Sequence, residues 1–402
     1  MLKTLLALLV AFGGIFSSGS KYPPEQDITL NNQAVNVHFG EYLDFSAQVS
    51  PIGKVQSAYI FITSRNHETI TCRAAIDSQG MITCRQDMKQ LGFPPFVYIN
   101  YWYQINLTQG DPYLTSKFTI EYKDDRFSWH SLQNQQFQVF WYNRDLAFGQ
   151  TVLNVAQHAI QSAQNVISES VPSPVRIYIY NTGLDLQAAL RIEDSPWVAG
   201  HALADSRVIL LSIPSGPEQK LELERQVPHE LVHILQYQAW GEKSKLIPTW
   251  LIEGMASNGE LYPNLEYQRV LSDAVKMQST IPIVELCNGF PREASNAYLA
   301  YAQSASFVSY LYKKYGTSGV QKLSNAYLDG MGCEEGPSFA LGNSLSQIEN
   351  RWKQEALADD PSRTILQNLS PYLIISALLF VPLAITLSGK VFRRKPGKVI
   401  TL

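Results

Sequence analysis

Two histidines and a glutamate lie close together in the sequence, with the spacing of a metal site. Residues 229–233 read His-Glu-Leu-Val-His. On an α-helix, positions i and i+4 lie about 40° apart on one face and one turn along the axis, so the imidazoles of His229 and His233 can point at one ion. Glu230 is rotated by about 100° from His229, which places its carboxylate beside the metal rather than on it. Zinc, which binds histidine nitrogen at about 2.0–2.1 Å, suits this pattern.

A catalytic zinc ion takes three protein ligands and leaves one position open, so a third ligand must come from downstream. Glu253 follows His233 by 20 positions and lies in the segment Trp-Leu-Ile-Glu-Gly-Met-Ala. A turn over residues 241–248 lets a second helix fold back on the first. The neighbours of Glu253 are apolar, and a buried carboxylate needs a partner such as a metal. The alternative for His229 and His233 is that they are two unrelated histidines on one helix. The alternative for Glu253 is an exposed acid on a helix.

The two motifs together resemble those of the gluzincin metallopeptidases, the group that contains thermolysin and the aminopeptidase-type enzymes. The spacing from His233 to Glu253 is that of thermolysin, and the Trp-Leu-x-Glu-Gly-x-Ala pattern is similar to the aminopeptidase branch. The resemblance covers roughly 135–358 and is closest to the peptidase MA-like domains of bacterial surface proteins. It implies that His229, His233 and Glu253 bind zinc and that Glu230 is the general base.

The resemblance also implies a tyrosine that stabilises the oxyanion from a later helix. Tyr301 matches best and Tyr298 second, with an ordinary core or surface tyrosine as the alternative. The chain departs from the family at two points. The Gly-x-Met-Glu-Asn strand that reads a substrate amino terminus is absent, and Ser257 stands where thermolysin has the Asp that supports a ligand histidine. Asn258, Glu260 or a backbone carbonyl are the candidates for that supporting contact.

The surrounding pattern predicts an α+β domain over residues 130–358, with strands first and helices after. We expect the apolar strand Arg207–Ile213 at the edge of the cleft, where it would pair with an extended substrate. Pro228 is expected at the entrance of the histidine helix, where a missing N–H costs little. His201 is either a residue of the cleft or a plain loop histidine. A further strand is expected over 175–180, and helices over 151–168, 184–190, 218–226, 229–238, 248–260, 296–315, 319–328 and 345–357.

Residues 22–125 predict a small β-sandwich of the immunoglobulin-like type, because roughly seven short alternating runs are separated by turn residues. Sandwiches carry many functions, so spacing or docking is the expected role. Of the three pairings that four cysteines allow, we expect Cys72–Cys84 and Cys287–Cys333. Free buried thiols and a zinc–thiolate site are the alternatives.

Two apolar segments predict a membrane-anchored protein. Residues 1–20 combine a charged start, a short apolar run and small residues, which is typical of a secretory signal peptide, with an uncleaved anchor as the alternative. Residues 371–389 are apolar and about long enough to cross a membrane, with a buried soluble helix as the alternative. A linker over 359–370 precedes them. Five cations in the tail 390–402 predict that it is cytoplasmic and that the zinc domain lies outside the cytoplasm.

Composition excludes other classes of protein. The 402 residues are 45% hydrophobic and 17% charged, which indicates folded domains rather than a disordered chain. The formal net charge is −3, whereas a nucleic-acid binder shows a basic surplus.

The sequence therefore predicts a single-pass cell-membrane zinc peptidase that acts on a peptide or protein substrate and binds no nucleic acid, with the oligomeric state open. The rival is a non-catalytic surface binding or adhesion protein that uses the β-sandwich, with a structural or degenerate zinc site. A structural zinc site normally closes with a fourth protein ligand.

Overall fold

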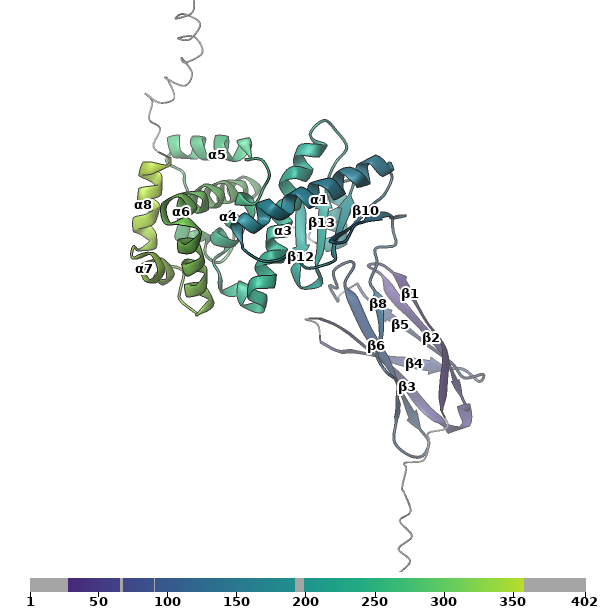
Figure 1. Ribbon diagram of the computed structural model, residues 1–402. Helices are drawn as coiled ribbons and strands as arrows, with labels where there is room; N and C mark the ends of the chain where they lie inside the picture. The colour runs from purple at the N-terminus through teal and green to yellow at the C-terminus, as the bar shows by residue number, and fades with distance from the viewer. Residues whose placement is uncertain (1–27, 66–67, 90, 192–198, 358–402) are drawn as a thin grey trace, which may run out of the picture. The chain divides into compact units, whose positions relative to one another are not determined.

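A computed structural model describes residues 28–65, 68–89, 91–191 and 199–357 of the chain, and they form two compact units (Figure 1). The first unit comprises the described residues up to 128 together with 189–191, and the second comprises 129–188 together with the described residues from 199 onward. The predicted signal peptide, linker, membrane span and basic tail lie outside the described residues. Within the described residues, no helix has the length and apolar character needed to span a membrane.

The first unit is an antiparallel sheet that turns back on itself. Its strand order is β1-β2-β5-β4-β3-β6-β7, and β8 also pairs with β6. Strand β4 pairs with β3 and then, through its last two residues, with β5, so both halves of the sheet share one strand. Alternate residues of β2 and β6 are buried, as the two-residue period of a strand requires. The strands are β1 (Thr29–His38), β2 (Tyr42–Ser50), β3 (Val55–Ser64), β4 (Ile70–Ile76), β5 (Met81–Asp87), β6 (Tyr98–Leu107), β7 (Tyr113–Leu114) and β8 (Phe118–Glu121).

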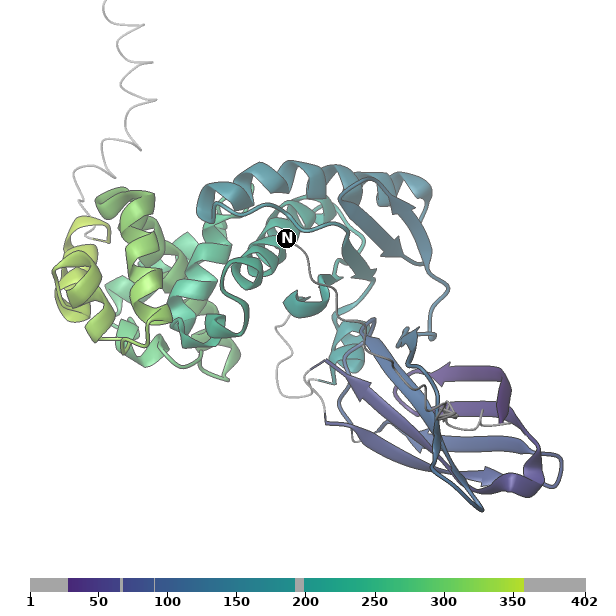
Figure 2. The same ribbon diagram turned by 60° about the horizontal axis from the view of Figure 1, so that its bottom comes forward.

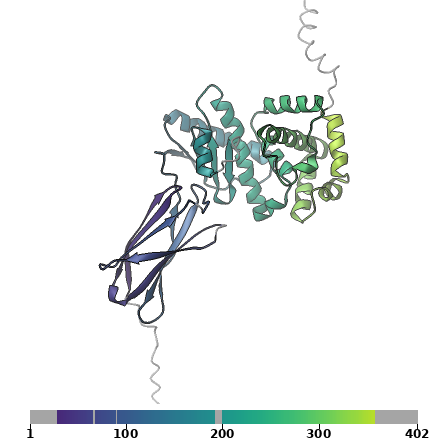
Figure 3. The same cartoon turned by 180° about the vertical axis from the view of Figure 1, so that it is seen from behind.

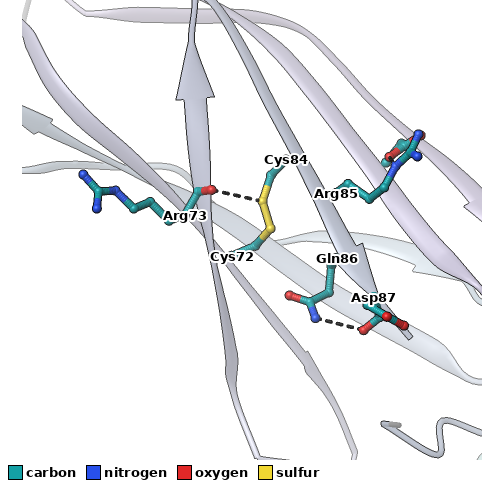
Figure 4. Close-up of a disulfide and its surroundings, with 7 residues drawn as sticks. Cys72, Arg73, Cys84, Arg85, Gln86 and Asp87 are labelled. Carbon is teal, nitrogen blue, oxygen red and sulfur yellow. Dashed lines mark hydrogen bonds and ion pairs between the residues drawn. A yellow bond between two sulfur atoms is a disulfide. The ribbon is translucent and has the colours of Figure 1, made fainter. Parts of the chain in front are cut away.

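A disulfide joins Cys72 on β4 to Cys84 on β5, the pairing that the sequence predicted (Figure 4). The turn between these strands explains why the two cysteines meet. The carboxylate of Asp77 accepts hydrogen bonds from the amides of Gln79 and Met81, both at 2.8 Å. Gly80 has a φ of +85°, which favours glycine at this position.

The second unit begins with a five-stranded sheet whose order is β12-β13-β11-β10-β9. Strands β10, β11 and β13 are parallel, and both edge strands are antiparallel to their neighbours. The expectation that the strand over 207–213 lies at the edge is wrong: β13 is interior and all five of its residues are buried. A continuous apolar run is typical of an interior strand, and the edge belongs to the more polar β12. The strands are β9 (His130–Gln133), β10 (Phe137–Trp141), β11 (Val175–Tyr180), β12 (Gly200–Leu203) and β13 (Val208–Ser212).

Helices α1 and α3 share one apolar core with this sheet (Figure 2). Helices α5 to α8, green to yellow, gather at the right of Figure 3. Helix α6 contains a break at Gly316, whose φ is +69°. A second disulfide joins Cys287 to Cys333, also as predicted. The helices are α1 (Leu146–Val166), α2 (Gly183–Leu190), α3 (Gln219–Trp240), α4 (Thr249–Asn258), α5 (Leu265–Lys276), α6 (Ala294–Leu328), α7 (Glu335–Leu341) and α8 (Leu345–Glu355), with short 3₁₀ turns η1 (Ile52–Lys54), η2 (Ala204–Ser206), η3 (Gly241–Leu246) and η4 (Ile283–Leu286).

Pro228 does not begin the histidine helix, and the expectation of two helices over 218–238 is wrong. Helix α3 is continuous, with Pro228 buried inside it. A proline there leaves the carbonyl four residues earlier without its helical partner. The amide of Leu261, beyond the end of α4, donates to that carbonyl of Glu224 at 3.1 Å. A tertiary hydrogen bond thus replaces the helical one and ties the segment after α4 to α3.

Candidate metal centre

Helices α3 and α4 bring His229, His233 and Glu253 together. One ligand atom from each residue lies within 4.8 Å of the others. Oε2 of Glu253 lies 3.4 Å from Nε2 of His229 and 3.5 Å from Nε2 of His233. Tetrahedral zinc with bonds of about 2.05 Å holds its ligand atoms about 3.4 Å apart. The donor set and these two spacings therefore fit zinc.

The electrostatics of the cluster also favour a cation. Burial alone would raise the pKa of Glu253, but the imidazoles of His233 and His229 outweigh it and hold that pKa far below its usual range. Burial lowers the pKa of His229, yet contacts with Glu253 and Glu260 and the charge of Glu230 raise it to about 10. Three carboxylates thus lie near this histidine and favour a positive charge there. A divalent metal ion would supply that charge.

Glu260 is the carboxylate that supports His229. Its Oε1 lies 3.4 Å from Nδ1 of His229, on the side of the ring away from Glu253. The hydrogen bond from Leu261 to Glu224 fixes the backbone next to Glu260. Of the candidates named from sequence, Glu260 therefore makes this contact. Asn258 instead donates to the carbonyls of Gly254 and Ala305, joining α4 to α6.

His233 has a different supporting residue, Gln236. Its Oε1 lies 2.8 Å from Nδ1 of His233. Its Nε2 donates to the carbonyl of Ile252 at 3.0 Å. The Gln236 side chain thus connects one histidine of the cluster with the residue that precedes Glu253.

Gly254 lets α4 lie close to α6 rather than to α3. A Cβ at this position would lie 2.4 Å from Cγ2 of Val308 and 2.5 Å from the carbonyl oxygen of Ser304. The helix that needs the space is α6, which also carries Tyr301.

Glu230 lies beside the cluster of His229, His233 and Glu253 but does not belong to it. It is only 6% exposed. Its carboxylate packs against the backbone of Gly200 on β12, where a Cβ would come within 2.5 Å of Oε1. The glycine therefore leaves space for the carboxylate between α3 and the edge strand.

These residues line a cleft with a volume of about 930 Å³, which also includes His201, Tyr267, Tyr298 and Tyr301. The ring of Tyr301 lies 6.4 Å from that of His229. The carboxylate of Glu253, followed by burial, raises the pKa of Tyr301 well above its usual value, so the phenol keeps its proton.

Tyr298 is turned toward α5, where its hydroxyl accepts a 3.5 Å contact from Nδ2 of Asn264. His201 lies on β12, not in a loop, and its side chain is exposed.

Sequence reasoning missed Gln236 and Tyr267. Gln236 had a usable signal, because it follows His233 by three positions and so shares a face of the helix. Tyr267 lies on α5, a helix that the sequence interpretation did not predict, and no nearby motif marked it. Burial and the charge of Glu260 raise the pKa of Tyr267 well above its usual value.

A family model for the Peptidase MA superfamily matches residues 155–358, half of the chain. The chain belongs to the Peptidase MA superfamily. The resemblance to peptidase MA-like domains drawn from the two motifs is therefore confirmed. The matched region contains α3, α4 and α6 and all of the residues discussed above at the metal centre.

Distant likenesses to solved structures accompany this match. An M1 zinc metallopeptidase from Deinococcus radiodurans is 10% identical, with 82% of this chain and 94% of that one covered and a TM-score of 0.36. An aminopeptidase N family protein from Idiomarina loihiensis is 8% identical, with 84% and 75% covered and a TM-score of 0.36. A family 56 carbohydrate-binding module that binds β-1,3-glucan is 15% identical, with 23% and 98% covered and a TM-score of 0.18. Curated protein sequences gave no match.

Proposed function

We propose that this Peptidase MA protein is a zinc metallopeptidase that hydrolyses peptide bonds with Glu230 as general base. The observation that carries the proposal is the meeting of two imidazole nitrogens and one carboxylate oxygen at zinc-ligand spacing. A second carboxylate, that of the buried Glu230, lies next to them and opens on the same cleft.

The chain's own residues supply the proton transfers. A zinc ion bound by His229, His233 and Glu253 would lower the pKa of water toward about 7 and polarise a carbonyl group. Glu230 would accept the proton of the attacking water at its carboxylate and deliver it to the leaving amine. The protonated phenol of Tyr301 would donate a hydrogen bond to the oxyanion that develops on the substrate.

The edge strand β12 offers a way to hold the substrate. It pairs with β13 on one side only, which leaves its other edge free for an extended peptide within the described sheet. His201 on this strand interacts electrostatically with Glu230, His233 and Glu253, so a peptide bound along β12 would lie beside the catalytic groups.

A purely structural zinc site is less well supported. Among the described residues, the cluster supplies three protein ligands, whereas structural zinc is almost always bound by four. A structural site also has no use for the buried carboxylate of Glu230, whose burial is costly without a role or partner.

Two further features belong to the same proposal. Strands β1-β2-β5-β4 and β3-β6-β7 follow the order A-B-E-D and C-F-G of constant-type immunoglobulin domains, which supports an immunoglobulin-like sandwich. The apolar segment 371–389 and the basic tail after it support anchoring in the cell membrane, with the zinc domain outside the cytoplasm.

The test is hydrolysis of a mixed peptide library by the purified protein. We expect cleavage that stops when a chelator removes the metal and returns when zinc is added. Glu230→Gln should retain one zinc per chain but lose about 10²- to 10⁴-fold in rate, because general-base catalysis is removed.

Glu266→Gln is the matched control, since Glu266 lines the same cleft but pairs with Arg269 on the protein surface. It should cleave at close to the wild-type rate. A Glu230→Gln protein that binds zinc and cleaves as fast as wild type would rule out the assigned base. A folded protein without stoichiometric zinc would rule out the metal centre itself.

A further inference from the structure

We propose that Gln236 is a positioning residue for the metal centre: its side-chain amide orients His233 for metal binding and ties it to the turn of α4 that carries Glu253. This inference rests on the proposed zinc site. It concerns a residue that no motif includes and that does not bind the metal itself.

The direction of the Gln236 amide follows from its two contacts. The carbonyl oxygen of Ile252 can only accept, so the group that faces it at 3.0 Å must be the NH₂ end of Gln236. The oxygen end of the amide then faces Nδ1 of His233 at 2.8 Å. The opposite orientation would place two oxygens against each other.

That direction fixes the tautomer of His233. An amide oxygen only accepts hydrogen bonds, so Nδ1 of His233 must carry the proton. The lone pair of Nε2 is then free, and Nε2 is the atom that faces Glu253 at 3.5 Å. The same contact holds the ring plane, because His233 lies one helical turn before Gln236 on α3.

The second contact of Gln236, with the carbonyl of Ile252, also helps to position the third ligand, Glu253. Ile252 immediately precedes Glu253, so the bond from Gln236 sets the position of α4 relative to α3 next to the ligand carboxylate. Gln236 is 2% exposed, and both ends of its amide are used on the two helices that carry the ligands. A side chain that merely filled the core at this position would need no polar group, since a buried amide is costly unless it is bonded.

Gln236→Met tests the proposal, because methionine has a similar length and shape but cannot make either hydrogen bond. Gln226→Met is the matched control: Gln226 lies on the same helix and lines the same cleft, and its amide donates to Glu222. The zinc dissociation constant would be measured on the full chain by competition with a chromophoric chelator. The thermal midpoint of each metal-free protein and the absorption spectrum of each cobalt-substituted protein would be recorded alongside.

Gln236→Met should weaken zinc binding about 10- to 100-fold, the usual cost of losing a contact behind a ligand histidine. Its cobalt spectrum should change, and its metal-free form should remain folded. Gln226→Met should match wild type in both affinity and spectrum. A Gln236→Met protein with wild-type zinc affinity and an unchanged cobalt spectrum would overturn the inference while leaving the zinc site intact. Wild-type protein that binds no zinc would instead overturn the proposed function.

If Gln236→Met does not fold, Gln236→Glu replaces it. A glutamate oxygen can still accept from Nδ1 of His233, but a carboxylate cannot donate to Ile252. We expect Gln236→Glu to bind zinc less tightly than wild type. An unchanged affinity would overturn the tie to α4.

Discussion

Tyr301 and Tyr298 lie three residues apart on α6, and both line the cleft, but their environments differ. The phenol of Tyr301 interacts most strongly with Glu253 and also with Glu230, whereas the hydroxyl of Tyr298 faces Asn264. We therefore expect Tyr301→Phe to lower kcat by about 10²- to 10³-fold, the usual cost of one lost oxyanion donor. Steady-state kinetics on a cleaved peptide, with zinc content determined in parallel, measures this.

Tyr298→Phe is the control for that prediction, because it removes the same hydroxyl from the same helix on the side that faces α5. Its kcat should stay near wild type. Equal losses in the two variants would mean that the hydroxyls act on folding or packing, and a fully active Tyr301→Phe would remove the oxyanion role from this residue.

The residues that sequence identified at the centre are those whose chemistry depends on local spacing. His229, Glu230 and His233 lie within one turn of one helix, so the helical repeat alone places them. Glu253 needed a second helix to fold back, and its apolar neighbours indicated burial. Gln236 was missed because its spacing from His233 indicates only a shared face of the helix, whereas its contact with Ile252 on α4 depends on the tertiary structure.

At the scale of elements, the distance between β12 and α3 sets where Glu230 can lie. A Cβ on Gly200 would come within 2.5 Å of Oε1 of Glu230 and 2.9 Å of Cδ2 of Leu211. The carboxylate is the end of a flexible side chain, so it would move before the strand does. We expect Gly200→Ala to fold and bind zinc but to lose about 10- to 100-fold in kcat/KM, because displacing a reacting group by about 1 Å has that effect.

Gly216→Ala is the matched control, since a Cβ there has no atom within 4 Å. It should leave zinc content, thermal midpoint and kcat/KM unchanged. A Gly200→Ala protein with full activity would show that the close packing of β12 on α3 does not hold the carboxylate.

The wrong or missing predictions of elements concern features that depend on tertiary contacts, which the local sequence pattern does not contain. Pro228 reads as a helix start, yet α3 continues through it because Leu261 takes up the freed carbonyl of Glu224. The run over 207–213 reads as a strand, but the sequence does not state which neighbours it pairs with. Helix α5 was not predicted, so the position of Tyr267 at the cleft could not be predicted either.

At the scale of the whole molecule, the two units have separate means of stabilisation. One apolar cluster of buried residues extends from Phe137 to Trp352 and lies entirely within the second unit. Each unit contains one disulfide. The sequence indicated this division, because alternating runs give way to helical spacing near residue 130 and because each predicted cysteine pair falls on one side of that change.

We therefore expect each disulfide to stabilise only its own unit. Cys287 and Cys333 close a loop of 46 residues, and Cys72 and Cys84 close one of 12. Loop-closure entropy therefore predicts that replacing each pair by serine lowers the free energy of unfolding by about 4 and about 3 kcal/mol, respectively.

Calorimetry should resolve two transitions, with zinc raising only the midpoint of the second unit, because a ligand stabilises the state that binds it. The Cys287→Ser, Cys333→Ser protein should lower that same transition, whereas the Cys72→Ser, Cys84→Ser protein should lower the other and leave the zinc-dependent shift unchanged. One transition that moves with either pair would mean that the units unfold together, and the metal centre would then depend on the first unit for its stability.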